Sequence, residues 1–304
     1  TEKGALMLKA GTEIFTPFSS GISSSYEIRD FLEDEKGYLW IATFGGGLDI
    51  CTPGLEEVAS LTFDHTNPYS INHNEVSCLC MDRTGIIWAG TYGLDKYNPK
   101  KEKFKLYDYI KNGKTGTNIS FRNVYSIYED DRKVLWIGSK SDGVHVYDRN
   151  TKEYFSITHT AGNPQSLSSN KVRLIKENPA GTLWIGTDDG GLNKVLLNDN
   201  RRPERFVHYR NNPLDPNSLT SDLVYSLFFD TGNTLWIGTD KGLNRMDLAT
   251  ETIKRYEPDS TQPNSLSNPT AYYIYGDVKE DIWIATDLGI NKYNPETDGF
   301  IHFM

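Results

Sequence analysis

Apolar residues in this chain form short runs separated by polar turns, and one run recurs at a nearly fixed spacing. A representative copy is residues 183–187, with the sequence Leu-Trp-Ile-Gly-Thr. Every tryptophan of the chain lies in such a run, 47 to 52 residues from the next: Trp40, Trp88, Trp136, Trp184, Trp236 and Trp283. A period of this length indicates an array of one supersecondary unit.

The repeat extends to both sides of each tryptophan. In the copy around Trp184, a polar turn (166–168) lies about seventeen residues earlier, and Val172 opens a segment of branched residues twelve residues earlier. A turn residue lies six residues before each tryptophan, and a glycine followed by an apolar residue, such as Gly191-Leu192, comes after it. Four short segments between Gly, Pro, Asn and Asp turns predict four strands per repeat.

No segment shows a sustained apolar spacing of 3.6 residues, so we expect no long helix. Four-stranded units repeated six times predict an all-β fold, a β-propeller of four-stranded blades. Sheets of a propeller pack face to face, which explains why the Leu-Trp-Ile run is continuously apolar. The six tryptophans are therefore predicted to be core between blades, and truncating one to Ala should cost roughly 3–5 kcal/mol. The glycine two residues after most of them would let the adjacent blade approach closely.

The chain begins in the middle of a repeat. Residues 3–8 align with residues 241–246, and residues 13–16 resemble a fourth strand. We expect one propeller domain over residues 1–304, a fragment of a seven-bladed ring whose open edge invites pairing with a second copy. The alternative is a six-bladed ring with an N-terminal ribbon. The predicted parts are a half-blade (1–20) and six complete blades: 21–69, 70–117, 118–165, 166–217, 218–264 and 265–304.

Composition narrows the functional classes. The formal net charge is -9 and no basic stripe is present, which argues against nucleic-acid binding. No apolar run approaches the twenty residues of a membrane-spanning helix. Cys51, Cys78 and Cys80 are expected to be small buried residues, and the six histidines fall at unrelated repeat positions. Neither a metal site nor a cofactor is predicted.

The repeat unit resembles that of a known family. Its parts are Asn-Pro-x-Ser-Leu-Ser, Val-x-x-Ile-x-x-Asp, Gly-x-Leu-Trp-Ile-Gly-Thr and Gly-Gly-Leu-Asn-x-Tyr, and residues 163–193 and 215–244 match best. This unit resembles the two-component regulator propeller repeat. The resemblance implies a periplasmic sensor region of a Bacteroidetes-type hybrid two-component system, which recognises an oligosaccharide.

The resemblance also implies partners. Family members place neighbouring propeller and β-sandwich domains before a membrane helix and a histidine kinase. This chain would then be a non-catalytic part of a protein anchored in the inner membrane, and homodimerisation is a further expectation. The repeat motif is structural, so it assigns no ligand-binding residue.

Two other functional classes stay open. Residues 34–40 and 82–88 show the pattern Asp-x-x-Gly-x-x-Trp, which resembles the structural Asp-box turn of sialidase propellers. Arg29, Arg122 and Arg173 lie near first strands and could converge as sialidase arginines do. Streptogramin-lyase propellers are a second enzymatic alternative, although their catalytic histidine pair has no evident counterpart here. A propeller that only binds or dimerises with other proteins is the third class.

Candidate ligand contacts follow from propeller geometry. The loop before the first strand and the loop between the second and third strands share one face, and their side chains vary between repeats. A sugar site needs aromatic faces for the pyranose ring and Asn, Asp or Arg side chains for hydroxyl or uronate groups. The predicted contacts are Tyr26, Phe44, Asn74, Tyr92, Arg122, Lys140, Lys171, Arg173, Asp189, Asp222, Asp240, Lys241 and Tyr272.

Overall fold

The computed structural model describes residues 6–8, 15–17, 27–53, 57–98, 103–107, 109–111, 118–120 and 123–303. Their regular elements are all β-strands. The chain divides into two compact units, residues 1–156 and 157–304. Within the described residues, no helix is long and apolar enough to cross a membrane.

The first unit contains three four-stranded sheets and two short ribbons. The ribbons pair β1 (Leu6–Leu8) with β2 (Phe15–Pro17), and β11 (Tyr109–Lys111) with β12 (Asn118–Ser120). The sheets comprise β3 (Glu27–Glu33), β4 (Leu39–Phe44), β5 (Gly47–Cys51) and β6 (Glu57–Leu61), then β7 (Cys78–Met81), β8 (Ile87–Gly90), β9 (Leu94–Asn98) and β10 (Lys103–Tyr107), then β13 (Val124–Glu129), β14 (Val134–Ser139), β15 (Val144–Asp148) and β16 (Tyr154–Ile157).

The second unit contains three more sheets of the same kind. They comprise β17 (Val172–Glu177), β18 (Leu183–Thr187), β19 (Leu192–Leu197) and β20 (Pro203–Tyr209), then β21 (Val224–Phe229), β22 (Thr234–Thr239), β23 (Leu243–Asp247) and β24 (Ile253–Tyr256), then β25 (Ala271–Gly276), β26 (Ile282–Thr286), β27 (Gly289–Asn294) and β28 (Gly299–Phe303).

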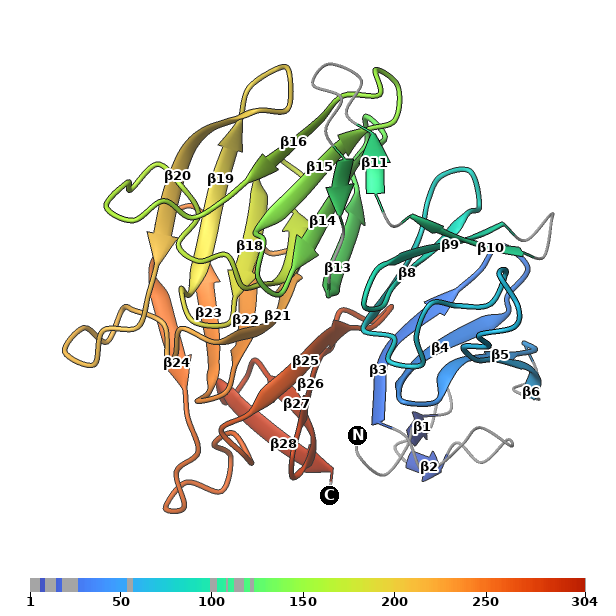
Figure 1. Cartoon of the computed structure of the whole chain (residues 1–304). Coiled ribbons are helices and arrows are strands. Elements are labelled where there is room, and N and C mark those ends of the chain that lie inside the picture. Colours follow the sequence, from blue (N-terminus) through green and yellow to red (C-terminus); the bar gives the residue numbers. More distant parts are fainter. Residues whose placement is uncertain are drawn as a thin grey trace. The chain divides into compact units, whose positions relative to one another are not determined.

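Each sheet is an antiparallel meander whose strands follow chain order (Figure 1). This arrangement confirms the predicted β-propeller of six four-stranded blades preceded by a two-stranded half-blade. That the blades form one domain stays a prediction, because the chain divides into two units. One local expectation was wrong: Asn118–Ser120, predicted as a polar turn, pairs with Tyr109–Lys111 as a short strand. The turn signal in the sequence carries no information about a partner strand.

Close packing between blades explains the small residues after each tryptophan. The second strands β14 and β22 are buried along their whole length. A Cβ atom added at Gly238 would lie 2.3 Å from the carbonyl oxygen of Ala271 in the next blade, so a side chain cannot fit there. At Gly186 the nearest atom, Cγ1 of Val224, would be 2.9 Å away. The predicted role of this glycine is therefore confirmed.

The tryptophans are fixed by a recurring hydrogen bond as well as by burial. In the fifth blade, the indole Nε1 of Trp236 donates to Oδ2 of Asp230 at 3.0 Å, and Oδ1 of the same carboxylate accepts the backbone N–H of Thr234. One Asp side chain thus closes its turn and anchors the indole. The same indole–carboxylate pair joins Trp40 to Asp34, Trp88 to Asp82, Trp136 to Asp130 and Trp283 to Asp277, at 3.0 to 3.1 Å.

The fourth blade lacks this acceptor. Asn178 occupies the Asp position, and its Oδ1 accepts the backbone N–H of Thr182 at 2.8 Å. The remaining polar group of an Asn side chain is an NH₂ donor, which cannot receive the indole N–H. Nε1 of Trp184 is consequently buried without a hydrogen-bond partner among the described residues.

Restoring the carboxylate should stabilise the fourth blade. We expect Asn178→Asp to raise the free energy of unfolding by about 1 kcal/mol, because it supplies a charged acceptor to a buried N–H donor. The matched change Asp230→Asn should lower the free energy of unfolding by about 1–3 kcal/mol. Urea denaturation of both variants measures these changes, and an unchanged or lower stability of Asn178→Asp would contradict the assignment.

Candidate functional site

The start of the first strand and the loop after the second strand lie at one edge of each sheet. These strands are antiparallel, so Val224 pairs with Thr239 in the fifth blade, and Ala271 pairs with Thr286 in the sixth. We call this edge, with its two segments in each blade, the loop edge. It holds the segments in which the sequence predicted ligand contacts.

A β-bulge interrupts the first strand at the loop edge in five blades. In the fifth blade the register shifts between Val224 and Ser226, so the ladder skips Tyr225. A bulge removes its extra residue from the regular alternation and re-aims the side chain, and bulges are frequent beside functional sites. The skipped positions, called bulge residues below, are Arg29, Tyr125, Arg173, Tyr225 and Tyr272.

In the second unit the bulge residues of consecutive blades touch one another. The guanidinium carbon of Arg173 lies 5.0 Å from the ring centroid of Tyr225, within cation–π range. The ring of Tyr225 lies 5.0 Å from that of Tyr272, centroid to centroid. Tyr272 remains 46% exposed. The three side chains form a continuous row, which we call the Arg-Tyr-Tyr row, across three blades.

In the first unit the bulge residues contact the loop of their own blade instead. The guanidinium carbon of Arg29 lies 4.7 Å from the ring centroid of Phe44. In the third blade, Nζ of Lys140 lies 5.8 Å from the ring centroid of Tyr125. Phe44 and Lys140 were predicted ligand contacts, and both lie at the loop edge beside a bulge residue.

Tyr92 forms the corresponding group in the second blade, where the described first strand has no bulge. Its ring centroid lies 4.1 Å from that of His73, and half of the residue is exposed. A hydrogen bond to Glu75 raises the pKa of the Tyr92 phenol. The predicted contact Tyr92 therefore presents an oriented aromatic surface.

The structure joins three predicted contacts of the fourth blade in ion pairs. Nζ of Lys171 lies 2.6 Å from Oδ2 of Asp189, and Nε of Arg173 lies 2.5 Å from Oδ1 of Asp188. The bond to Asp189 raises the pKa of Lys171. Lys171 and Arg173 are thus oriented by neighbouring carboxylates, of which the sequence had identified only Asp189.

Two predicted contacts have a role within the fold. Oδ1 of Asn74 accepts the backbone N–H of Phe63 at 2.6 Å, and Oδ1 of Asp222 accepts that of Asn211 at the same distance. Asn170, in the fourth blade, accepts the N–H of His159 in the same way. This repeated bond ties the segment after a fourth strand to the start of the next blade. Asn74 and Asp222 therefore secure the loop edge from within.

Of the four remaining predicted contacts, the structure describes two, Asp240 and Lys241. Asp240 is partly buried, and its Oδ1 atom is buried without a hydrogen-bond partner among the described residues. The side chain of Lys241 is exposed, and its backbone N–H donates to Oγ1 of Thr239. Tyr26 and Arg122 lie outside the described residues.

Sequence reasoning missed Tyr225 and Tyr125 as members of this edge. A signal for them exists, because every bulge residue lies eleven residues before a tryptophan. The corresponding residue of the second blade is Ser77. The bulge itself could not be predicted, because the sequence of an apolar strand does not show which of its residues is left out of the strand pairing.

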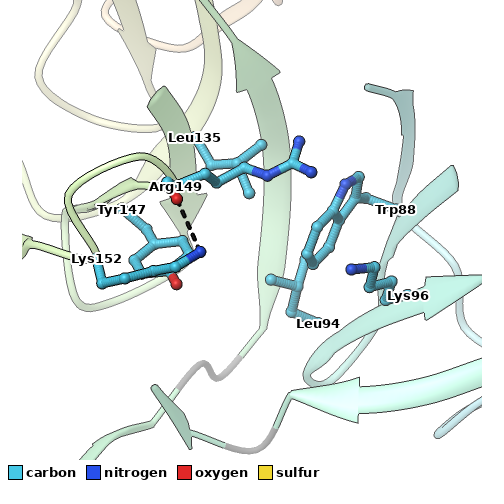
Figure 2. Close-up of a pocket in the computed structure, with 7 residues that line it drawn as sticks. All are labelled: Trp88, Leu94, Lys96, Leu135, Tyr147, Arg149 and Lys152. Carbon is cyan, nitrogen blue, oxygen red and sulfur yellow. Dashed lines mark hydrogen bonds between the residues drawn. The ribbon is translucent and has the colours of Figure 1, made fainter. Parts of the chain in front are cut away.

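A cavity of about 140 Å³ lies between the second and third blades, among strand side chains. Figure 2 shows Trp88, Leu94 and Lys96 on one wall, facing Leu135, Tyr147, Arg149 and Lys152 on the other. Arg149 lies 2.7 Å from Asp82 and 2.6 Å from Glu129, so two carboxylates compensate its charge. The cavity includes no bulge residue, and we assign it to packing between blades.

The repeats match a known family. The sequence pattern described as "Two component regulator propeller" matches residues 21–45, 70–93, 118–141 and 166–189. Each match runs from the polar turn through the first two strands to the loop edge. These four segments are therefore similar to the two-component regulator propeller repeat. A curated relative, histidine kinase P4 of Formosa agariphila, is 28% identical over 185 residues, which are 59% of this chain and 13% of that protein.

Solved structures share the fold. The extracellular domain assigned to a hybrid two-component system of B. thetaiotaomicron matches 91% of this chain and 35% of its own, with 24% identity and a TM-score of 0.68. Virginiamycin B lyase from Staphylococcus aureus matches 91% of this chain and 83% of its own, with 12% identity and a TM-score of 0.63. At these identities the likeness establishes the propeller fold alone.

Substitution of a side chain that holds the loop edge together should lower the free energy of unfolding more than substitution of a side chain that is exposed on it. Asp222→Ala removes the acceptor of the Asn211 N–H and should lower the free energy of unfolding by about 1–3 kcal/mol. Tyr272→Ala removes an exposed ring and should change it by no more than about 0.5 kcal/mol. Thermal denaturation followed by circular dichroism tests both, and equal losses would place Tyr272 in the core.

Proposed function

We propose that the chain is a sensor module of a two-component system and binds an oligosaccharide at the loop edge. The observation that carries the proposal is the series of bulge residues, which vary between Arg and Tyr while the surrounding framework repeats. A fixed scaffold that displays variable side chains at one edge is typical of a binding surface.

The chemistry of the edge supports a sugar ligand. Phe44, Tyr92 and Tyr272 are each 43% to 50% exposed, and their rings offer flat apolar faces to the C–H face of a pyranose. In the fourth blade, Arg173 and Asp189 offer partners for hydroxyl groups. Aromatic surface combined with a few oriented polar groups is the usual composition of a small-ligand site.

The chain itself is proposed to be non-catalytic. The recurring carboxylates, such as Asp230, are engaged by an indole and by backbone N–H groups of their turn. These bonds account for the Asp-box resemblance without a catalytic role. Catalysis by the longer protein would belong to a histidine kinase elsewhere in it, since the curated relative is a histidine kinase.

The location and the partners belong to the same proposal. We place the module in the periplasm, beside further propeller and β-sandwich domains of a protein anchored in the inner membrane, with homodimerisation as a route for the signal. Support comes from the family of the repeats and from the fold shared with an extracellular domain of a hybrid two-component system.

Isothermal titration calorimetry against a panel of plant and host oligosaccharides tests the proposal. We expect saturable heat with one glycan family, because binding to a preformed edge reaches a stoichiometric end point. Sustained heat after each injection would mean turnover and would overturn the non-catalytic assignment. Silence across the panel would favour a protein-interaction propeller instead.

A matched pair of variants locates the site. Tyr272→Ala should weaken binding about tenfold, because stacking of one ring contributes on the order of 1–1.5 kcal/mol. Tyr275→Ala removes an equally exposed tyrosine of the same strand, 54% exposed and outside the loop edge, and should leave the affinity unchanged. Equal effects of the two variants would move the site away from the loop edge.

A further inference from the structure

We propose that the loop edge of residues 157–304 selects oligosaccharides that carry no carboxylate or sulfate group. The inference rests on the proposed function and specifies its ligand class. It starts from the Arg-Tyr-Tyr row, since Arg173 would be the natural partner of an anionic sugar. The surroundings of Arg173 remove that possibility.

Two of the three cations of this edge, Lys171 and Arg173, are already paired with carboxylates. Arg173 forms its ion pair with Asp188 and Lys171 forms one with Asp189, both at 2.6 Å or less. A uronate or a sulfate would have to displace a carboxylate that the fold holds in place. Such an exchange replaces one ion pair by another and leaves a carboxylate without its partner, so the ligand's charge brings no net attraction.

The edge as a whole carries more negative than positive charge. Its segments in this fully described part of the chain are residues 169–173, 188–190, 221–225, 240–241, 268–272 and 287–288. They contain five carboxylates and three cations: Asp188, Asp189, Asp222, Asp240, Asp287, Lys171, Arg173 and Lys241. An approaching anion therefore meets a surface of its own sign, which disfavours binding at low ionic strength.

The acidic groups surround the middle of the row. Burial raises the pKa of Tyr225; Arg173 acts to lower it, and Asp240, Asp188 and Asp287 act to raise it further. These three carboxylates are therefore close enough to influence the phenol. In addition, Oδ1 of Asp240 receives no hydrogen bond from the described residues, so no donor offsets its charge there.

A neutral sugar meets these conditions. Its hydroxyl groups can donate hydrogen bonds to an exposed carboxylate such as Asp287, and its C–H face can stack on Tyr272. Hydrogen bonds to charged acceptors are stronger than those between neutral groups. An added carboxylate at C6 would replace a donor by a like charge, which weakens binding at the same position.

Titration with matched tetrasaccharides tests the inference, using calorimetry on the 304-residue chain. The pairs are cellotetraose with its glucuronan counterpart, β-1,4-mannotetraose with its mannuronan counterpart, and α-1,4-galactotetraose with tetragalacturonate. In the pair that binds, we expect the neutral member to bind about tenfold more tightly. The ratio should shrink when salt rises from about 50 mM to about 500 mM.

Variants that remove one charge test whether this edge determines the ratio of the affinities for the neutral and the acidic tetrasaccharide. Asp240→Asn and Asp287→Asn should each reduce the preference to about threefold, because each removes one like charge near the row. Glu204→Gln makes the same change in charge on β20, near the end of that strand away from the loop edge, and should leave the ratio unchanged. Thermal denaturation verifies that each variant is folded. If one Asp variant does not fold, the other alone is enough to test whether this edge determines the ratio.

The outcomes separate this inference from the proposed function. Equal or tighter binding of an acidic member, or a ratio that neither Asp variant changes, overturns the selectivity and leaves the sensor proposal standing. If no member of any pair binds and the wider panel is silent as well, the proposed function fails and this inference fails with it. Tighter neutral binding that at least one of the two Asp variants reduces supports the inference.

Discussion

The hydrogen bond from a tryptophan Nε1 to an aspartate six residues earlier organises five of the six described blades. The indole belongs to the second strand, and the carboxylate belongs to the turn that joins the first strand to the second. Asp230 therefore fixes the turn, the register between the strands and the rotamer of Trp236 together. Because the indole also packs between blades, one side chain links local turn geometry to the stacking of the sheets. In the fourth blade this bond is absent, and Trp184 is held by burial and by its ring contacts with Tyr209 and Phe229.

Much of the fold was predictable because propeller blades are built from local signals. Strand pairing in a meander connects segments that are adjacent in sequence, so turns and apolar runs suffice to define it. The close approach at Gly238 was likewise visible, because a glycine that recurs inside an apolar run indicates a neighbouring backbone too near for a side chain. Asn118–Ser120 was not predictable as a strand, since its partner, Tyr109–Lys111, lies in a segment with no counterpart in the repeat.

The site was predictable only in outline. Propeller geometry predicted the segments of the loop edge in which Arg173 and Tyr272 lie, but it did not show that Asn74 and Asp222 accept backbone hydrogen bonds. A short polar side chain at a loop edge looks the same in the sequence whether it faces solvent or closes a turn. Ion pairs such as Arg173 with Asp188 depend on side-chain directions, which the order of residues along a chain does not contain.

The bulge in the first strand assigns packing and variation to different residues of the strand. On either side of the bulge, side chains must match the neighbouring blade, and substitutions there disturb packing. The skipped residue takes part in no strand pairing, so it can change from Arg29 to Tyr125 to Arg173 while the ladder around it stays the same. Duplicated blades can therefore differ at one position each while the strand pairing around that position is kept.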